Sequence, residues 1–349
     1  MLIKKICRIA ASIIAAFFII TAVFLGMLFY FNSPPKGGVT VTDTVTLMDN
    51  EEIRMEVREG ESVASVGMRL EAANLIKNDY IWYTIFRLKQ GYLRAGMYQF
   101  DQGLTLLSLY NLFVSGKQML VAVMIPEGST LKKTALIMEE AGICEMKDFL
   151  DSARNEKIVH EYNIPADTME GYLYPDTYYF SLRYPANLVV RSMADTFYKR
   201  LMKFGIDASM LSAKDLFKKV TLASIVEREY RIKSEAPVIA GVFQNRLDRN
   251  MRLESCATVE YIISEIQGKA HPKRLFNRDI EIANPYNTYL YKGLPPGPIA
   301  SPGAVALNAV FNPSKTSYLF FRVVDPKTGK HYFSETFDDH IKAGELLVK

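Results

Sequence analysis

The N-terminal segment constrains this chain most, because it decides where the rest of the protein can fold. Residues 9–31 form a run of 23 residues without a charged side chain. As a helix rising about 1.5 Å per residue, the run would reach roughly 34 Å, enough to cross the hydrocarbon core of a bilayer. The sequence therefore predicts a transmembrane helix over residues 9–31, after a tail formed by residues 1–8.

The charges around this run predict its orientation. Lys4, Lys5 and Arg8 precede it, and acidic residues follow from Asp43 onward. A basic flank stays on the cytoplasmic side, so we expect a single-pass protein of the cytoplasmic (inner) membrane whose remaining domains are extracytoplasmic. A cleaved signal peptide is the alternative, but its apolar core would span only about 7–15 residues before a small-residue cleavage site. The longer run and its bulky end at residues 29–32 favour the anchor.

Composition limits the remaining possibilities. The chain has 349 residues and a net charge of +4, with no long basic run, so no nucleic-acid partner is expected. Its cysteines, Cys7, Cys144 and Cys256, show no metal-binding or redox spacing, and a disulfide between the last two stays open.

No motif indicates a metal or a cofactor. None of the four histidines has metal-ligand spacing to another, and the glycine- and proline-rich stretch 293–297 lacks the residues of a phosphate loop. A Gly-x-Ser-x-Gly nucleophile turn is also missing from the sequence. We therefore expect no metal site and no cofactor.

The region after the anchor holds a short linker, a strand and an internal repeat. Residues 32–50 read as a linker followed by a strand over 39–47. Residues 57–62 and 125–130 each place a Glu-Gly pair before a helical stretch, at an offset of 68 residues. Each copy predicts strand, turn and helix, although two such units can look alike by chance.

The rest of the chain mixes strands and helices without regular alternation, which predicts an α+β fold. A strand is expected over 97–100, and helices over 106–116, 186–204, 214–231 and 237–249. Residues 284–303 contain five prolines and three glycines, so they predict a long and functional loop. Residues 318–324 and 331–334 predict a hairpin.

The helix predicted over 214–231 carries the most informative carboxyl group. On a helical wheel, Leu216, Val220 and Ala223 fall within roughly 60° of one another, and Glu227 falls in the middle of that apolar stripe. Burial would raise the pKa of Glu227, as a general acid for glycosidic cleavage requires. The alternative is an ordinary glutamate paired with an arginine or reaching the helix edge.

A second carboxylate for this chemistry does not come from the same helix face. Glu229 lies about 160° around the helix from Glu227. A pair of catalytic carboxylates would therefore need a partner from elsewhere in the chain.

Seven segments in order resemble the endolytic murein transglycosylase family, the YceG-like proteins. They are Ile125–Thr130, Glu170–Tyr178, Leu222–Glu229, Val242–Leu247, Asn284–Tyr289, Gly293–Ile299 and His331–Ser334. The resemblance covers nearly the whole chain. It implies a LysM-like α+β subdomain over residues 51–118 and a mixed α+β catalytic domain over residues 119–349, with a second LysM-like repeat at about 121–150.

The resemblance also implies a reaction. Glu227 matches the family's catalytic glutamate, and the chemistry would be lytic: the 6-hydroxyl of N-acetylmuramic acid attacks its own anomeric carbon and leaves a 1,6-anhydro end. One carboxyl group can serve as acid and then as base. The expected partners are peptidoglycan strands and, as candidates, peptidoglycan synthases, and the expected role is to terminate nascent strands.

Five further positions match the family and are predicted to shape the glycan groove: Asn245, Arg246, Thr258, Asn287 and Tyr289. A purely structural role is the alternative for each. The sequence departs from the family pattern at Cys256 and Ala257, where an Asp and a Pro are usual, which puts full activity in doubt.

Three other functions compete with the lytic enzyme. A lysozyme-like hydrolase would use water, and a non-catalytic peptidoglycan-binding scaffold would need only the anchor and the LysM-like part. A pyridoxal-phosphate lyase is disfavoured, because an exported domain has poor access to that cofactor and no lysine context supports a Schiff base.

Overall fold

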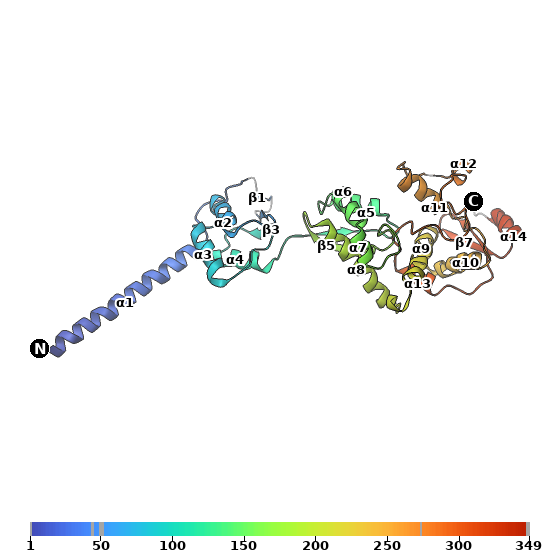
Figure 1. Cartoon of the computed structure of the whole chain (residues 1–349). Coiled ribbons are helices and arrows are strands. Elements are labelled where there is room, and N and C mark those ends of the chain that lie inside the picture. Colours follow the sequence, from blue (N-terminus) through green and yellow to red (C-terminus); the bar gives the residue numbers. More distant parts are fainter. Residues whose placement is uncertain (1, 43–44, 49–51, 273, 347–349) are drawn as a thin grey trace. The chain divides into compact units, whose positions relative to one another are not determined.

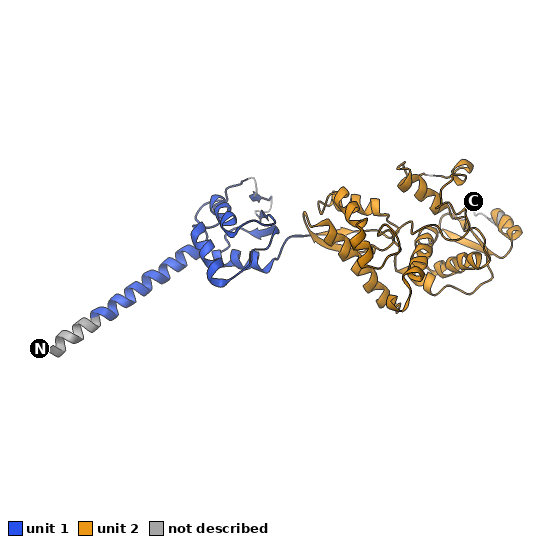
Figure 2. Cartoon of the chain, viewed as in Figure 1, with its two compact units in different colours: residues 1–120 blue, residues 121–349 orange. Residues whose placement is uncertain are grey.

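The computed structural model describes residues 2–42, 45–48, 52–272 and 274–346 (Figure 1). The chain divides into two compact units, residues 1–120 and 121–349 (Figure 2). Strands and helices are mixed in both, so the predicted α+β class is confirmed.

The first unit begins with helix α1 (Leu2–Asn32). Its segment Ser12–Asn32 is long and apolar enough to cross a membrane, close to the predicted 9–31. The end of α1 is tied to the body of the unit, because the Lys77 Nζ donates to the Tyr30 carbonyl at 2.6 Å and the Leu107 N–H donates to Asn32 Oδ1 at 3.0 Å. Helix α1 therefore ends directly against the folded part of the first unit.

The body of the first unit is a small sheet covered by helices. Its elements are β1 (Val45–Leu47), β2 (Glu52–Val57), α2 (Val63–Ala72), α3 (Asp79–Lys89), β3 (Gly96–Asp101) and α4 (Leu106–Ser115). The strands pair antiparallel in the order β1-β2-β3. Alternate residues of β2 are buried, as the period of a half-covered strand requires. Strand β1 is shorter than the predicted 39–47, of which residues 43 and 44 lie outside the described residues. The likeness of this unit to LysM stays a prediction.

The repeat in the sequence coincides with a repeated local geometry. Gly60 and Gly128, which are 68 residues apart, both have a left-handed backbone with φ of 74° and 72°. Two residues later Ser62 and Thr130 cap helices that begin one residue further on, α2 and α5 (Leu131–Glu140). Each cap side chain accepts a hydrogen bond from a backbone N–H of the first turn, which stabilises the helix start.

The second unit holds most of the chain. Its further elements are β4 (Leu120–Met124), α6 (Met146–Ala153), α7 (Glu156–Glu161), β5 (Thr177–Ser181), α8 (Ala186–Lys203), α9 (Ala213–Glu229), α10 (Ala236–Asp248), α11 (Cys256–Tyr261), α12 (Asn277–Ile280), α13 (Ala304–Phe311), β6 (Phe320–Asp325), β7 (Lys330–Ser334) and α14 (Phe337–Lys342). A π-helical turn, Ile262–Ile266, continues α11. Helices α9, α10 and α13 pack on one another (Figure 1), and β6 pairs antiparallel with β7 as predicted.

The helix boundaries follow the sequence signals with one informative exception. Helix α4 ends before Gly116, which takes the left-handed conformation of a C-terminal cap, and α10 starts with Pro237 in its first turn. Helix α9, however, ends at Glu229 rather than at the predicted Arg231, because Tyr230 turns to an extended backbone. That early end bears on the site described below.

The proline-rich loop at 284–303 lies against a glycine from a distant segment. Gly171 has φ of +83°, and a Cβ placed on it would lie 2.5 Å from the Cβ of Pro298. The neighbouring Glu170 is buried, and both of its carboxyl oxygens accept the Leu131 N–H at the start of α5. This segment therefore fixes the loop and the start of α5 together.

We predict that Gly171→Ala destabilises the second unit by about 3 kcal/mol, because a left-handed alanine costs about 1–2 kcal/mol and overpacking against Pro298 adds about 1–3 kcal/mol. Gly205→Ala is the matched control, since Gly205 has φ of +79° with no atom within 4 Å of an added Cβ. It should cost only the left-handed conformation, about 1–2 kcal/mol. Pulse proteolysis in urea measures both, and equal losses would show that contact with Pro298 contributes nothing.

Candidate functional site

A groove of about 620 Å³ in the second unit collects charged and polar side chains from segments far apart in the sequence. Its lining comes from the turn before α5, the end of α9, the α11 region and the proline-rich loop. The lining residues are Glu127, Gly128, Thr130, Lys133, Glu227, Arg228, Tyr230, Arg231, Ala257, Tyr261, Ser264, Glu265, His271 and Ile299. Its size is typical of a small-molecule site.

Glu227 reaches this groove from the last turn of α9. Leu216, Val220 and Ala223 are buried as the stripe predicts, but so are all the other residues from 220 to 226, so this part of α9 is enclosed on all sides. Because the helix ends at Glu229, the Tyr230 side chain turns back and its hydroxyl donates to Glu227 Oε1 at 3.1 Å. The end of the helix thus supplies both the acid and its first hydrogen-bond donor.

The proline-rich loop supplies the second donor. The Ile299 N–H donates to the Ser224 Oγ at 3.0 Å, which ties the loop to α9 one turn before Glu227. The Gly303 N–H then donates to Glu227 Oε2 at 2.8 Å. Both oxygens of Glu227 are therefore held by donors, and the carboxyl group has a fixed orientation.

A second carboxyl group lies beside the same glycine. The turn that carries it is joined to the loop by two backbone bonds, from the Gly128 N–H to the Ser301 carbonyl at 2.9 Å and from the Ser301 N–H to the Ser129 carbonyl at 2.8 Å. A Cβ on Gly303 would lie 2.0 Å from Glu127 Oε1. Glu127 and Glu227 therefore both border Gly303, and a side chain at this position would displace the Glu127 carboxyl group.

This arrangement sets the protonation of Glu227. The pKa of Glu227 is raised to about 7 as the net result, mainly by desolvation and also by the nearby Glu127 carboxylate. The hydrogen bonds from Gly303 and Tyr230, and the charge of Arg228, oppose the shift. The net result is a carboxyl group that exchanges its proton near neutral pH, which is the property an acid/base catalyst needs.

Arg228 braces the groove from the position next to Glu227. Its Nη2 donates to Glu260 Oε2 at 3.1 Å and lies 3.1 Å from the His271 Nε2. The guanidinium is thus paired with Glu260 and not with the Glu227 carboxyl. The alternative that Glu227 forms an ion pair with an arginine is therefore not observed among the described residues.

Four of the five residues predicted to shape the glycan groove brace loops. The Asn245 amide donates to the Thr316 and Tyr318 carbonyls at 2.7 and 2.9 Å. Asn287 is buried and its amide donates to the Ile280 and Ile282 carbonyls. These contacts match the structural alternative, and neither residue lines the groove around Glu227.

Thr258 and Arg246 bond mainly to backbone as well. Thr258 is fully buried and donates to the Ser255 carbonyl at 2.8 Å. Arg246 is buried, and its Nε and Nη1 donate to the carbonyls of residues 319, 252 and 253. Arg246 and the fifth residue, Tyr289, line a second pocket instead. Their part in substrate binding stays a prediction.

The two positions that depart from the family pattern, Cys256 and Ala257, are the first two residues of α11 and face different pockets. Ala257 lines the groove of Glu227, whereas Cys256 lines the second pocket, where its Sγ lies 3.1 Å from the Tyr289 hydroxyl. Cys144 and Cys256 are both free thiols, so they form no disulfide. Glu229 accepts a hydrogen bond from the Ser255 hydroxyl and faces the second pocket, away from Glu227 as the wheel predicts.

Sequence reasoning missed Glu127, Arg228 and His271 as parts of the groove. A signal existed for Glu127, because it belongs to the motif 125–130, but the repeat suggested that its Glu-Gly pair only forms a turn. Nothing in the spacing of His271 predicts its approach to Arg228, since 43 residues separate them. Among the residues that the structure describes, no cluster of three or more His, Cys, Asp or Glu could hold a metal ion.

The fold and the groove together define an α+β protein in which the partly buried Glu227 lies beside two loops. Comparison with known proteins shows which family has these features. The YceG-like family model matches residues 55–345, so the chain belongs to the YceG-like family. It is 27% identical over 339 residues to the endolytic murein transglycosylase of Bacillus subtilis (strain 168), covering 89% of each chain.

Two further likenesses agree with this assignment. The endolytic murein transglycosylase of Streptococcus pneumoniae serotype 2 is 28% identical over 318 residues, which cover 82% of this chain and 57% of that protein. A crystal structure of a YceG-like protein from Listeria monocytogenes aligns with a TM-score of 0.56 at 29% identity, over 84% of this chain and 99% of that one.

We predict that Glu227→Gln raises the stability of the second unit increasingly as pH rises from about 4.5 to about 7. The raised pKa means that the folded protein binds a proton that the unfolded chain has released, so stability from this group falls across that window. Glutamine has no proton to lose. Pulse proteolysis at pH 5 and pH 8 measures the difference, and a variant that gains nothing at pH 8 would contradict a buried acid.

Proposed function

We propose that this protein is a peptidoglycan lytic transglycosylase that cuts glycan strands with Glu227 as acid and base. The observation that carries the proposal is the Glu227 carboxyl in a groove, held by the Gly303 N–H and the Tyr230 hydroxyl, with a pKa near 7. The names of the relatives supply the substrate class, since both are called endolytic murein transglycosylases.

The proposed reaction needs one proton carrier. Protonated Glu227 gives its proton to the glycosidic oxygen as the bond from the anomeric carbon to that oxygen breaks. The 6-hydroxyl oxygen of the same N-acetylmuramic acid then bonds to the anomeric carbon, and its proton passes to the Glu227 carboxylate. The product is a 1,6-anhydro end, no water is consumed, and Glu227 returns to its starting state.

Hydrolysis is the second candidate, and Glu127 is the observation that favours it. Two carboxyl groups flanking a glycosidic bond can activate a water molecule or form a glycosyl intermediate. Such a partner has to come from outside α9, because Glu229 lies on the other side of that helix, and Glu127 comes from the turn before α5. Glu127 has a second possible effect, which is to hold the pKa of Glu227 up.

The location proposed for this reaction is the outer face of the cytoplasmic membrane. Segment Ser12–Asn32 supports a single-pass anchor, and the basic residues before it support an extracytoplasmic groove. Release of strands near the membrane would suit termination of nascent glycans, with the LysM-like unit holding the strand and synthases as partners. These finer roles rest on the family resemblance.

We predict that Glu227→Gln lowers the release of fragments from purified glycan strands by about 10²–10⁴-fold, because it removes general acid/base catalysis. Mass spectrometry of the wild-type products should show 1,6-anhydro ends. If the products carry only reducing ends, the reaction is hydrolysis and the lytic mechanism is wrong. If the Glu227→Gln protein is as active as wild type, Glu227 is not the catalyst and the non-catalytic scaffold is favoured.

The pH profile should separate the two roles of Glu127. Activity requires protonated Glu227, so kcat/KM falls as pH rises through about 7. Glu127→Gln removes a neighbouring negative charge and should move this limb to lower pH. Tyr230→Phe removes a bond that favours the ionised form and should move it to higher pH. If Glu127→Gln instead abolishes activity as fully as Glu227→Gln, Glu127 acts chemically and hydrolysis is favoured.

A further inference from the structure

A second pocket of about 440 Å³ lies on the other side of the α9 end and is not used by the mechanism above. Its lining combines basic, aromatic and acidic side chains from α9, α10, the α11 start, the hairpin and α14. The residues are Glu229, Arg246, Leu253, Glu254, Cys256, Tyr289, Phe320, Phe321, Arg322, Val323, His331, Phe337 and His340. A pocket of this size and composition is typical of a site for a small organic ligand.

Aromatic rings form one wall of the pocket. The Phe320 ring centroid lies 5.7 Å from that of Phe337 and 5.5 Å from that of His340. Phe337 is 59% exposed, so an apolar surface is left open to a ligand. The Arg246 guanidinium lies over Phe320, 5.0 Å from its centroid, which holds a cation against this wall.

The charges of the pocket leave one cation without a carboxylate partner. Arg246 is paired with Glu254 at 3.0 Å. Arg322 donates to the His340 carbonyl at 3.2 Å, and among the carboxylates whose side chains the structure describes none forms an ion pair with it. The His340 Nδ1 is buried and has no hydrogen-bond partner among the described residues. The pocket therefore offers a guanidinium donor for one anionic group.

The acidic residues decide which anion fits. Glu229 and Glu254 line the same pocket, and they would repel a ligand with two negative charges such as a phosphate. A ligand with one carboxylate and several N–H donors can instead bond to Arg322 and to these acidic oxygens together. A short peptide that ends in a free carboxylate has both features, and its side chains can lie on the aromatic wall.

We propose that this second pocket binds the carboxylate end of a peptide stem carried by the glycan strand, with Arg322 as its main anion-binding residue. The inference rests on the proposed function in that the strand is peptidoglycan. The two sites are joined by neighbouring residues: Glu227 and Glu229 face different pockets from one helix end, as do Ala257 and Cys256. A strand in the groove can therefore be recognised by its sugar at one site and by its peptide at the other.

The test measures binding of two synthetic muramyl tripeptides, one with a free terminal carboxylate and one with a terminal amide, to the full chain in detergent micelles. Glu227→Gln protein prevents cutting during calorimetry. We expect the free acid to bind about tenfold tighter than the amide, as charged hydrogen bonds allow. In Arg322→Gln this ratio should fall to about one.

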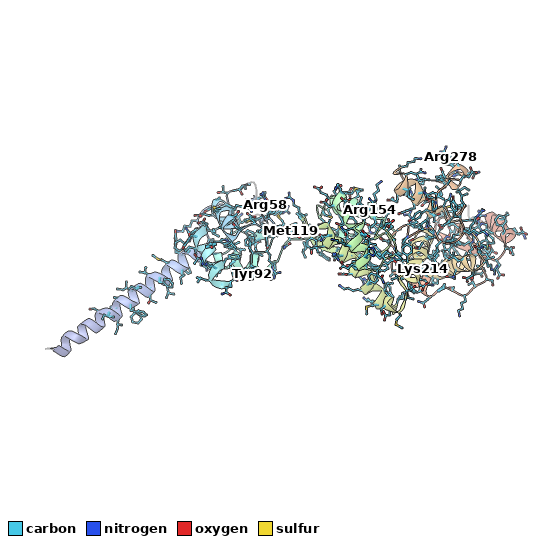
Figure 3. The ribbon with its side chains drawn as sticks, in the orientation of Figure 1. Arg58, Tyr92, Met119, Arg154, Lys214 and Arg278 are labelled. Atoms are coloured by element: carbon cyan, nitrogen blue, oxygen red, sulfur yellow. The ribbon has the colours of Figure 1, made fainter. Side chains whose placement is uncertain are left out.

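Arg278→Gln is the matched control, since Arg278 lies on α12 with its side chain 83% exposed and outside the second pocket (Figure 3). It should keep the tenfold ratio. Phe337→Ala should weaken the binding of the acid and of the amide equally, because it removes part of the aromatic wall. Phe337 is exposed, so this variant should stay folded and tests the pocket even if Arg322→Gln misfolds.

Equal binding of acid and amide to the protein with Arg322 intact would overturn the inference, as would an unchanged ratio in Arg322→Gln. Because these measurements involve no cleavage, they are separate from the fate of the proposed activity. If Glu227→Gln protein releases the same products as wild type, the proposed activity is wrong. The binding inference would still hold if the preference for the free acid is lost in Arg322→Gln.

Discussion

The hydrogen bond from the Gly303 N–H to Glu227 is the interaction on which the rest of the site depends. It fixes a carboxyl group that burial would otherwise leave both costly and free to rotate. The same bond lowers the pKa of Glu227, but desolvation outweighs it and the pKa stays raised, at about 7. The loop that supplies this donor must therefore be placed accurately.

Placement of that loop explains much of the second unit. Prolines remove backbone freedom from residues 284–303, and the loop is then fixed from beneath by Gly171, from the side by Ser224 and from the opposite turn by Gly128. At Gly171 the approach of Pro298 leaves no space for a side chain. Stability and chemistry therefore depend on the same close approaches.

The sequence predicts the parts of the site that obey a local period. Glu227 follows from the 3.6-residue repeat of α9, and the length of the irregular loop follows from its prolines and glycines. The approach of Glu127 depends on bonds between residues about 170 positions apart, for which no local pattern exists. The prediction placed the end of α9 at Arg231, which was wrong: the helix ends at Glu229, where Tyr230 takes an extended backbone and bonds to Glu227 three residues earlier. Asn245 and Asn287 were predicted from motifs. A motif alone does not tell whether a polar side chain supports a loop or contacts a ligand.

The position of Glu127 shows how one groove can serve two kinds of chemistry. A lytic reaction asks a single carboxyl group to give a proton and then accept one, so a pKa near the working pH serves both steps about equally. A neighbouring carboxylate helps by raising that pKa, and it does so without touching the substrate. The same neighbour becomes a catalyst only if a water molecule can enter between it and the sugar. The difference between the two reactions therefore lies in whether the 6-hydroxyl or a water molecule attacks the anomeric carbon.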